Sequence, residues 1–245
     1  MNRDEFFAAA DALPFADLEQ LLGRGGAVIV APHPDDESLG CGALISEAAA
    51  AGRSVRIIVL SDGTRSHPNS KAFPRERLRA LREEEARRAA NALGVDAPQI
   101  TFVGLPDGRV PVAGADAGRA SAAIVRAIEQ AGAEALFVTW RHDQHSDHQA
   151  AYAIARSAQH RLARIRLFEY SIWGRGVPFE TDLNMPPRGW RFASRGHRDR
   201  KRAAILSHRS QTSGLISDDP EGFTLSPGMI EDILARDEIF LEMDP

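Results

Sequence analysis

The sequence GAVIVAPHPDDE, residues 26–37, joins a short apolar run to a polar cluster. The apolar run over 26–31 has the length and composition of a fully buried strand. A second stretch, ALFVTWRHDQHSDH at residues 135–148, repeats this arrangement, with an apolar run over 135–140 before three histidines and two aspartates. Open α/β sheets bind ligands at the carboxyl ends of their parallel strands. We therefore expect the two polar clusters to meet at one edge of a sheet.

Strand-like and helix-like segments alternate along the chain as far as residue 170. This alternation predicts an α/β fold: a doubly wound, mostly parallel, Rossmann-like sheet in a three-layer α/β/α sandwich. Glycine and proline mark the ends of most segments. The other expected strands cover 55–60 and 100–103, and the expected helices cover 38–51, 75–93, 119–131 and the segment from the second cluster to about residue 162.

The two ends of the chain depart from this alternation. Residues 1–25 space apolar side chains at helical intervals and predict one or two short helices packed on the sheet. Residues 171–245 are irregular and predict a lid or rim, with a basic helix near 198–208 and a helix that begins at Ser226 and Pro227. We expect residues 1–245 to form a single domain.

Composition narrows the classes of function. The net charge of −4 gives no general attraction for polyanions, so we expect no nucleic-acid partner. No apolar run approaches the roughly 18–20 residues of a membrane helix, and the N-terminal residues lack a signal pattern, so we expect a cytoplasmic protein without an integral membrane segment. The single cysteine, Cys41, excludes an internal disulfide and a thiolate cluster and is expected to be a small buried packing residue. The sequence does not specify whether the chain forms a homo-oligomer.

Two interpretations of the polar clusters compete. Acidic residues at a helix N-terminus offset the helix dipole, and Ser146 with Gln149 has capping-box spacing, so the clusters could simply start helices. Capping, however, gives no reason for histidine, yet three of the eight histidines lie within residues 142–148 and His33 begins the first cluster. Two imidazoles and one carboxylate are the three protein ligands that leave a fourth position of zinc open for water. We favour a catalytic metal site.

The remaining side chains then take roles in hydrolysis. Of the adjacent Asp35 and Asp36, one is expected to bind the metal and the other to accept a proton from water, and spacing alone does not assign them. A histidine that does not bind metal, oriented by an aspartate, would stabilise an oxyanion or protonate a leaving amine. His145 with Asp147 is the candidate pair.

These motifs resemble those of the LmbE-like, or PIG-L-type, zinc-dependent de-N-acetylases, which act on substrates containing N-acetylglucosamine. That family carries Ala-His-Pro-Asp-Asp-Glu after its first strand and His-Pro-Asp-His after a later one. Here the motifs read HPDDE at residues 33–37 and HSDH at residues 145–148. The resemblance implies the following roles: His33, Asp36 and His148 as ligands of Zn²⁺, or of Fe²⁺; Asp35 as general base; His145 as the cationic group that faces the oxyanion; and Asp147 as the partner of His145.

Weaker similarities extend from about residue 26 to 215. They include LSDG at 60–63, GLPDG at 104–108 and HRSQ at 208–211. The resemblance implies that Arg82 and Asp107 approach sugar hydroxyls; a surface salt bridge for Arg82 and a turn for Asp107 are the alternatives. The chain departs from the family at Ser146, where proline is usual, and over residues 140–143, which lack glycine.

The leading expectation is a metal-dependent hydrolase that removes an N-acetyl or related N-acyl group from an aminosugar, with a small-molecule or glycan substrate. One alternative is a two-metal phosphoesterase to which Asp62 and His67 contribute. Another is a non-catalytic metal- or glycan-binding module. Dinucleotide binding finds little support, because no Gly-x-Gly-x-x-Gly follows the first strand. The sequence does not specify the aminosugar or the acyl group.

Overall fold

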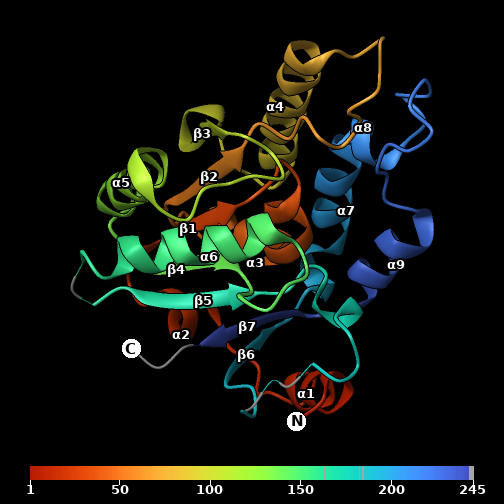
Figure 1. The fold of residues 1–245 in the computed structure, drawn as a ribbon. Coiled ribbons are helices and arrows are strands. Elements are labelled where there is room, and N and C mark those ends of the chain that lie inside the picture. The colour runs from red at the N-terminus through yellow and green to blue at the C-terminus, as the bar shows by residue number, and fades with distance from the viewer. Residues whose placement is uncertain (163, 182, 184, 243–245) are drawn as a thin grey trace.

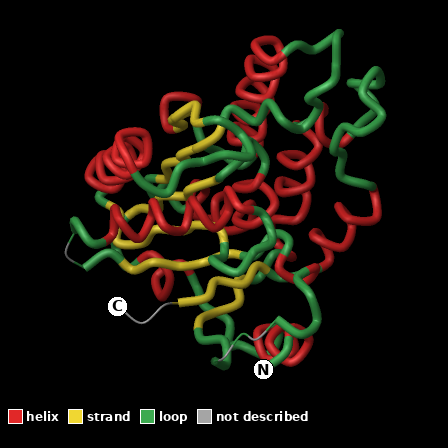
Figure 2. Tube along the Cα trace, in the orientation of Figure 1, coloured by secondary structure: helices red, strands yellow, loops and turns green. Residues whose placement is uncertain are grey.

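The computed structural model describes residues 1–162, 164–181, 183 and 185–242, and its described strands form one sheet in the order β3-β2-β1-β4-β5-β7-β6 (Figures 1 and 2). Five neighbouring strands are parallel: β3 (Ile100–Leu105), β2 (Val55–Ser61), β1 (Gly26–Ala31), β4 (Ala133–Thr139) and β5 (Arg166–Tyr170). β7 (Glu238–Glu242) and β6 (Gly189–Phe192) add antiparallel pairings at one edge. The predicted α/β fold with a mostly parallel sheet is confirmed.

Both faces of the sheet are covered by helices, which explains why β1 is apolar at every position. Ala27 and Ile29 pack into one core, beneath α3 (Asp36–Ala50), α4 (Arg75–Ala92) and α7 (Arg198–Ser207). Val28 and Val30 pack into a second core, beneath α5 (Gly114–Ala131) and α6 (Ser146–Gln159). Figure 1 shows α6 lying across one face and α3 on the other. The result is the expected three-layer sandwich.

The N-terminal segment forms α1 (Arg3–Ala10) and α2 (Leu18–Leu22), as predicted. Residues 171–242 contain more regular structure than predicted. Besides α7 and the expected helix α9 (Pro227–Ala235), capped by Ser226, they form α8 (Arg209–Thr212), β6 and β7. Strands of four and five residues are too short for a period to stand out, so only pairing in the folded chain identifies them. Short 3-10 helices occupy Ala97–Gln99, Gly174–Gly176 and Arg195–His197.

Two local predictions need comment. α5 begins at Gly114, five residues before the predicted start, because Ala117 is buried against the sheet and tertiary packing outweighs the low helix propensity of the glycines. Cys41 is fully buried on α3, as expected. None of the described helices combines the length and the apolar character that a membrane span requires.

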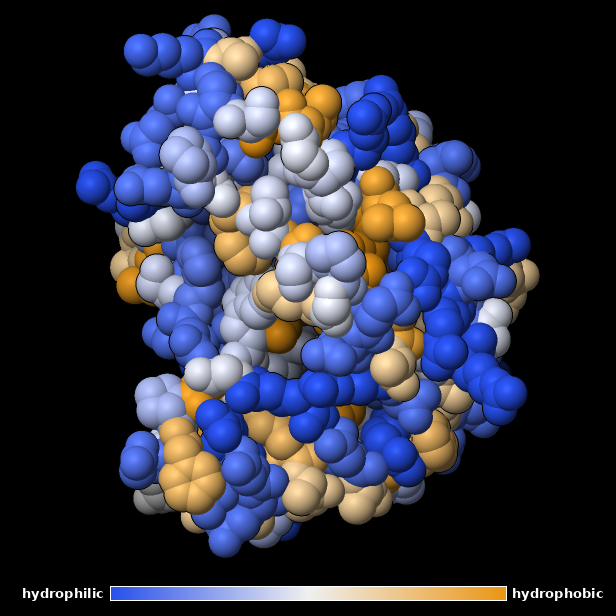
Figure 3. All heavy atoms as spheres, turned by 90° about the vertical axis from the view of Figure 1, so that its right-hand side faces the viewer, coloured by the Kyte–Doolittle hydropathy of each residue, from blue (hydrophilic) through white to orange (hydrophobic). Residues whose placement is uncertain are grey.

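The strand order reverses at β1, which lies between β2 and β4. β1 and β4 are in register, with Val30 opposite Val138, so the loops that follow them leave the sheet side by side. Such a switch point is where a doubly wound sheet opens a crevice for ligands. The loops after the parallel strands run toward the right-hand side of Figure 1, and Figure 3 shows that side, where polar and apolar side chains are mixed.

A buried ion pair links β7 to α7, and its carboxylate is also hydrogen-bonded to α3. Lys201 Nζ lies 2.6 Å from Glu238 Oε1, and the Glu238 carboxylate also accepts hydrogen bonds from the amides of Ala43 and Leu44, at 2.7 and 2.9 Å. Both charged side chains are almost fully buried. The pair therefore joins α7, β7 and the middle of α3.

Lys201→Met should lower the free energy of unfolding by about 3 kcal/mol, because it leaves the Glu238 carboxylate buried without a countercharge. Urea unfolding measures the change. Arg202→Met is the matched control, since Arg202 pairs with Glu231 at the surface and its loss should leave the midpoint unchanged. Equal midpoints for the two variants would contradict a stabilising role of the buried pair.

Candidate metal centre and pocket

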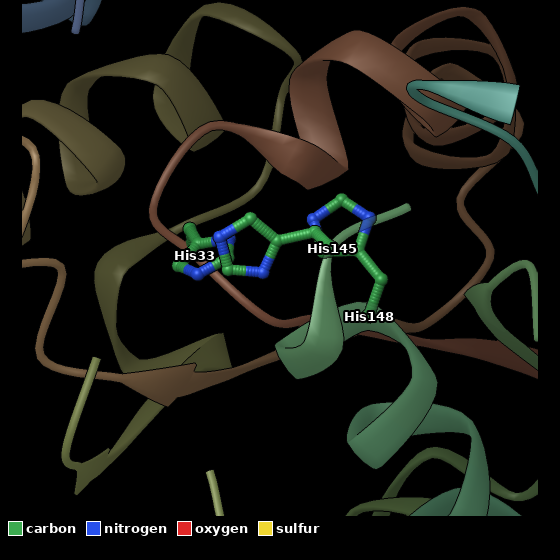
Figure 4. A group of neighbouring side chains, drawn as sticks. All are labelled: His33, His145 and His148. Carbon is green, nitrogen blue, oxygen red and sulfur yellow. The ribbon is translucent and has the colours of Figure 1, made fainter. Parts of the chain in front are cut away.

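Three histidines converge at the carboxyl edge of the sheet (Figure 4). His33 lies in the loop between β1 and α3, His145 is the N-cap residue of α6, and His148 lies in the first turn of α6. The ring centroids of His33 and His145 are 4.6 Å apart, and those of His145 and His148 are 5.2 Å apart. The strand order thus brings together two clusters that are more than a hundred residues apart in the sequence.

One carboxylate oxygen of Asp36 lies between two of these rings. Asp36 Oδ2 is 3.2 Å from His33 Nδ1 and 3.4 Å from His148 Nε2. Tetrahedral bonds of about 2.0–2.2 Å place neighbouring ligand atoms about 3.3–3.6 Å apart. Each of these two distances therefore matches that between neighbouring ligands of a single divalent ion.

The surroundings of His148 also fit a metal. The side chain is fully buried, and within the described chain neither ring nitrogen makes a hydrogen bond. Nδ1 is 3.4 Å from Asp143 Oδ2, which leaves Nε2 directed at Asp36. Buried polar atoms normally have a hydrogen-bond partner. The unpaired Nε2 of His148 is therefore consistent with a ligand position. Burial lowers the pKa of His148, but Asp36 and Asp143 outweigh it and raise the pKa to about 9.

Two further carboxylates face the outer nitrogen of His33. His33 Nε2 is 3.2 Å from Asp107 Oδ1 and 3.2 Å from Asp147 Oδ2. Burial alone would lower the pKa of His33, but hydrogen bonds to Asp107, Asp147 and Asp36 together raise it well above the ordinary value. An imidazole whose outer N–H is held by a carboxylate is the usual arrangement of a metal-binding histidine.

The position of Asp147 corrects one prediction. Its carboxylate was expected to orient His145, but it accepts hydrogen bonds from the amides of Gly108 and Val110, at 2.6 and 3.0 Å, and contacts His33. The main-chain N–H of Asp147 instead donates to His145 Nδ1 at 3.2 Å. Asp147 lies in the first turn of α6, and the loop after β3 supplies the two amides that bind its side chain.

The same hydrogen bond decides the tautomer of His145. Because Nδ1 accepts from an amide, the ring proton of the neutral imidazole is on Nε2. Burial, followed by the charges of His33 and His148, lowers the pKa of His145. In the neutral ring, Nε2–H is therefore the group available as a hydrogen-bond donor.

Asp35 is held beside this cluster by Arg82. The guanidinium donates to Asp35 Oδ2 at 3.2 Å and to the carbonyl oxygens of Pro34 and Gly63, both at 2.8 Å. Arg82 is only 3% exposed, so the alternative of a surface salt bridge is wrong. Burial raises the pKa of Asp35 to about 6, although Arg82 opposes this shift. A carboxylate with such a pKa is suited to accept a proton near neutral pH.

Asp107 is also more than a turn residue. Its side chain is buried; Oδ2 accepts a hydrogen bond from the amide of Arg65 at 2.7 Å, and Oδ1 faces His33. Burial opposes ionisation, but His33 and then the Arg65 amide outweigh it and lower the pKa of Asp107 to about 2. Asp107 and Arg82 both line the pocket and both hold other site residues.

The pocket has a volume of about 520 Å³ and is contiguous with a second hollow of about 470 Å³. His145, Gln144, Trp173 and Phe223 line both. Trp173, Gln211 and Phe223 come from the region after residue 170, so this region supplies part of the rim. Sequence reasoning named none of these three individually; only Gln211 lies in a recognised motif, HRSQ. The other pocket residues are His33, Asp35, Asp36, Arg65, Ser66, Arg82, Asp107, Gly108 and Ser146.

Asp62 and His67, the residues expected to contribute to a second metal site, have other partners. Asp62 pairs with Arg75 at 2.6 Å, and His67 Nδ1 contacts Ser66 Oγ at 3.2 Å. Among the described residues, neither belongs to a group of side chains spaced to hold an ion. His33 belongs to both of the groups that are so spaced, one with His145 and His148 and the other with Asp107 and Asp147. The geometry therefore gives Asp62 and His67 no part in a metal site.

The fold and the site together define an α/β protein with a histidine–aspartate centre at the switch point of its sheet. The chain matches the family model of PIG-L, described as GlcNAc-PI de-N-acetylase, over residues 28–159. That range is more than half of the chain, and the protein belongs to this family. A search of curated proteins gives no match.

Solved structures share the fold. The conserved protein TT1542 from Thermus thermophilus is 27% identical, with a TM-score of 0.62 over 88% of this chain and 93% of its own. An N,N'-diacetylchitobiose deacetylase from Pyrococcus horikoshii is 17% identical, with a TM-score of 0.67 over 98% and 92%. A 4-carboxy-2-hydroxymuconate hydratase from Pseudomonas putida is 16% identical, with a TM-score of 0.62 over 89% and 94%. The fold therefore hosts more than one reaction, and the side chains of the site must specify which.

Proposed function

We propose that the protein is a metal-dependent hydrolase that removes the N-acetyl group, or a related N-acyl group, from an aminosugar. One observation supports this most directly: the Asp36 oxygen lies between His33 and His148 at the spacing of metal ligands, while Asp35, held separately, lines the same pocket. Membership of the PIG-L family supports the same reaction. The proposed cofactor is Zn²⁺, with Fe²⁺ as the alternative suited to the same ligands.

His33, Asp36 and His148 would hold the metal. When bound, a divalent ion at these ligands would lower the pKa of a water molecule and polarise the amide carbonyl. Asp147 and Asp107 would keep the ring of His33 in place through its outer nitrogen. The amide of the substrate would lie in the pocket between His145 and Asp35, which both line it.

Asp35 is the proposed general base. Arg82 holds Asp35 Oδ2, which fixes the direction of the carboxylate. Asp35 takes a proton from the attacking water and later delivers it to the departing amine nitrogen. Asp35 is thereby regenerated within one turnover, and the proton that the carboxylic acid product loses on ionising passes to the released amine.

His145 is the proposed oxyanion donor. Its Nε2–H stays in one tautomer because the Asp147 amide occupies Nδ1. A neutral N–H donor stabilises the oxygen as negative charge develops on it, and it needs no change of protonation to do so.

The reaction is tested by incubating the zinc-loaded protein with N-acetylated monosaccharides, disaccharides and nucleotide sugars. Fluorescamine detection of the free amine and enzymatic detection of acetate should report equal amounts of the two products. Release of neither product from any N-acyl sugar, with zinc or ferrous iron, would contradict the proposal. A two-metal phosphoesterase would instead release phosphate and bind two ions per chain.

The second hollow supports a further part of the proposal, a substrate that extends beyond one sugar ring. Trp173 and Phe223 meet at its border, with ring centroids 5.8 Å apart. The main-chain N–H of Trp173 donates to Asp143 Oδ2 at 2.8 Å, which ties this rim to the neighbour of His148. Aromatic faces and an amide side chain, Gln144, suit the apolar face and the hydroxyls of a second pyranose.

Trp173→Ala should raise KM about fivefold more for an N-acetylated disaccharide than for the monosaccharide, because an aromatic contact contributes about 1 kcal/mol beyond its buried area. Steady-state kinetics with the two substrates measure this ratio. Phe179→Ala is the matched control, since Phe179 is exposed and lines neither hollow. Equal effects on both substrates would refute a second sugar position.

A further inference from the structure

The HRSQ segment, residues 208–211, has no role in the mechanism above, yet three of its four side chains are buried. His208, Ser210 and Gln211 are each at most 1% exposed, whereas Arg209 is exposed. The segment lies where α7 passes into α8. Burying a polar side chain costs free energy unless the group is hydrogen-bonded, and the contacts of His208 and Ser210 lead toward Asp35.

His208 reaches the main chain of Asp35 through Glu37. His208 Nε2 lies 3.4 Å from Glu37 Oε1, which also accepts a hydrogen bond from Ser38 Oγ at 2.7 Å. The other oxygen, Glu37 Oε2, accepts a hydrogen bond from the amide of Asp35 at 3.2 Å. In the described chain, His208 Nδ1 has no hydrogen-bond partner, so the polar contacts of the ring are made by Nε2.

The backbone of Asp35 needs this support. Its φ of 144° lies where L side chains are rarely found. A backbone of this kind costs on the order of 1–3 kcal/mol and persists only when its surroundings hold it. The hydrogen bond from the Asp35 amide to Glu37 is one such restraint, and it fixes the direction in which the carboxyl group leaves the chain.

Ser210 anchors the helix that carries Arg82, the partner of the Asp35 side chain. Its amide and hydroxyl donate to the two oxygens of Glu85, at 2.8 and 2.6 Å. Glu85 lies on α4, one turn after Arg82, and Arg82 donates to Asp35 Oδ2. The same segment therefore contacts both helices, α3 and α4, that position Asp35.

We propose that the HRSQ segment is a positioning device for Asp35, with His208 as the positioning residue for its main chain and Ser210 for α4, the helix that carries its partner Arg82. This inference rests on the proposed function insofar as Asp35 is the base. Nothing in it requires His208 to touch substrate or metal. Its effect should therefore fall on kcat, while KM and metal content stay unchanged.

The activity test is a double-mutant cycle in the zinc-loaded protein. His208→Ala should lower kcat by about 10²-fold, the cost of a small misplacement of a reacting group. His208→Gln, whose amide nitrogen replaces Nε2, should restore most of the rate, and Arg209→Ala should behave as wild type. Combined with Asp35→Asn, His208→Ala should cause no further loss, because residues that act as a unit are not additive. Multiplied losses, or a KM effect alone, would overturn the inference.

A second measurement does not depend on turnover. Hydrogen exchange of the peptide covering residues 33–38 should become at least about tenfold faster in His208→Ala, while exchange in α9 stays unchanged. Unchanged protection at residues 33–38 would overturn the inference even if the protein hydrolysed no amide. Absence of amine release by the wild type would refute the proposed function instead, so the two failures are distinguishable.

Discussion

Replacing Asp35 by asparagine should lower kcat for amide hydrolysis by about 10²–10⁴-fold while zinc content stays at the wild-type value. The amide side chain keeps the size of the carboxyl group and can accept from Arg82, but it cannot take a proton from water. Asparagine also tolerates positive φ better than most residues, so the strained backbone at this position should persist. Steady-state rates and elemental analysis of the same sample measure the two quantities.

Asp116→Asn is the control for this experiment. Asp116 pairs with Arg119 on the exposed surface of α5, away from the pocket. It should retain full activity. An active Asp35→Asn enzyme would remove Asp35 from the role of base, and a variant that loses zinc would indicate that Asp35 is itself a ligand.

Replacing His148 by alanine should abolish both metal binding and activity, since it removes one of three proposed ligands from a fully buried position.

A smaller loss of zinc affinity is expected when Asp147, a neighbour of the proposed ligand His33, is changed. Asp147→Asn weakens one of the two outer partners of His33, so zinc affinity should fall by about 10–100-fold and be recoverable with added zinc. Competition with a chelator, followed by elemental analysis, measures both affinities.

His142→Ala is the matched control for the ligand experiment. His142 lies in the same loop, six positions before His148, but its side chain is exposed and lines neither hollow. Its zinc affinity should equal that of the wild type. Retention of one equivalent of zinc in His148→Ala would exclude His148 from the ligand set.

Much of the parallel sheet could be predicted locally. Strand β1 was predicted over 26–31 and is observed there, because a strand buried on both faces shows an unbroken apolar run between glycine and proline. β6 and β7 could not be predicted in this way. Both are short; β6 is the edge strand, and β7 lies between β5 and β6. Gly189, Trp190 and Arg191 of β6 show no alternating pattern, so only their pairing with β7 identifies them as a strand.

The side-chain types of the candidate site were determined by the sequence itself: the HPDDE and HSDH motifs already contain every proposed ligand, the base and the oxyanion donor. Only the tertiary structure decided which atoms meet. The register of β1 with β4 brings Asp36 close to His148. The loop after β3 hydrogen-bonds the Asp147 carboxylate, which contacts His33 and not His145. The aromatic rim and the HRSQ contacts likewise come from distant segments. Chemical identity is a local property of a chain, whereas hydrogen-bond partners depend on which backbone groups the packed fold brings near, and no local pattern encodes that.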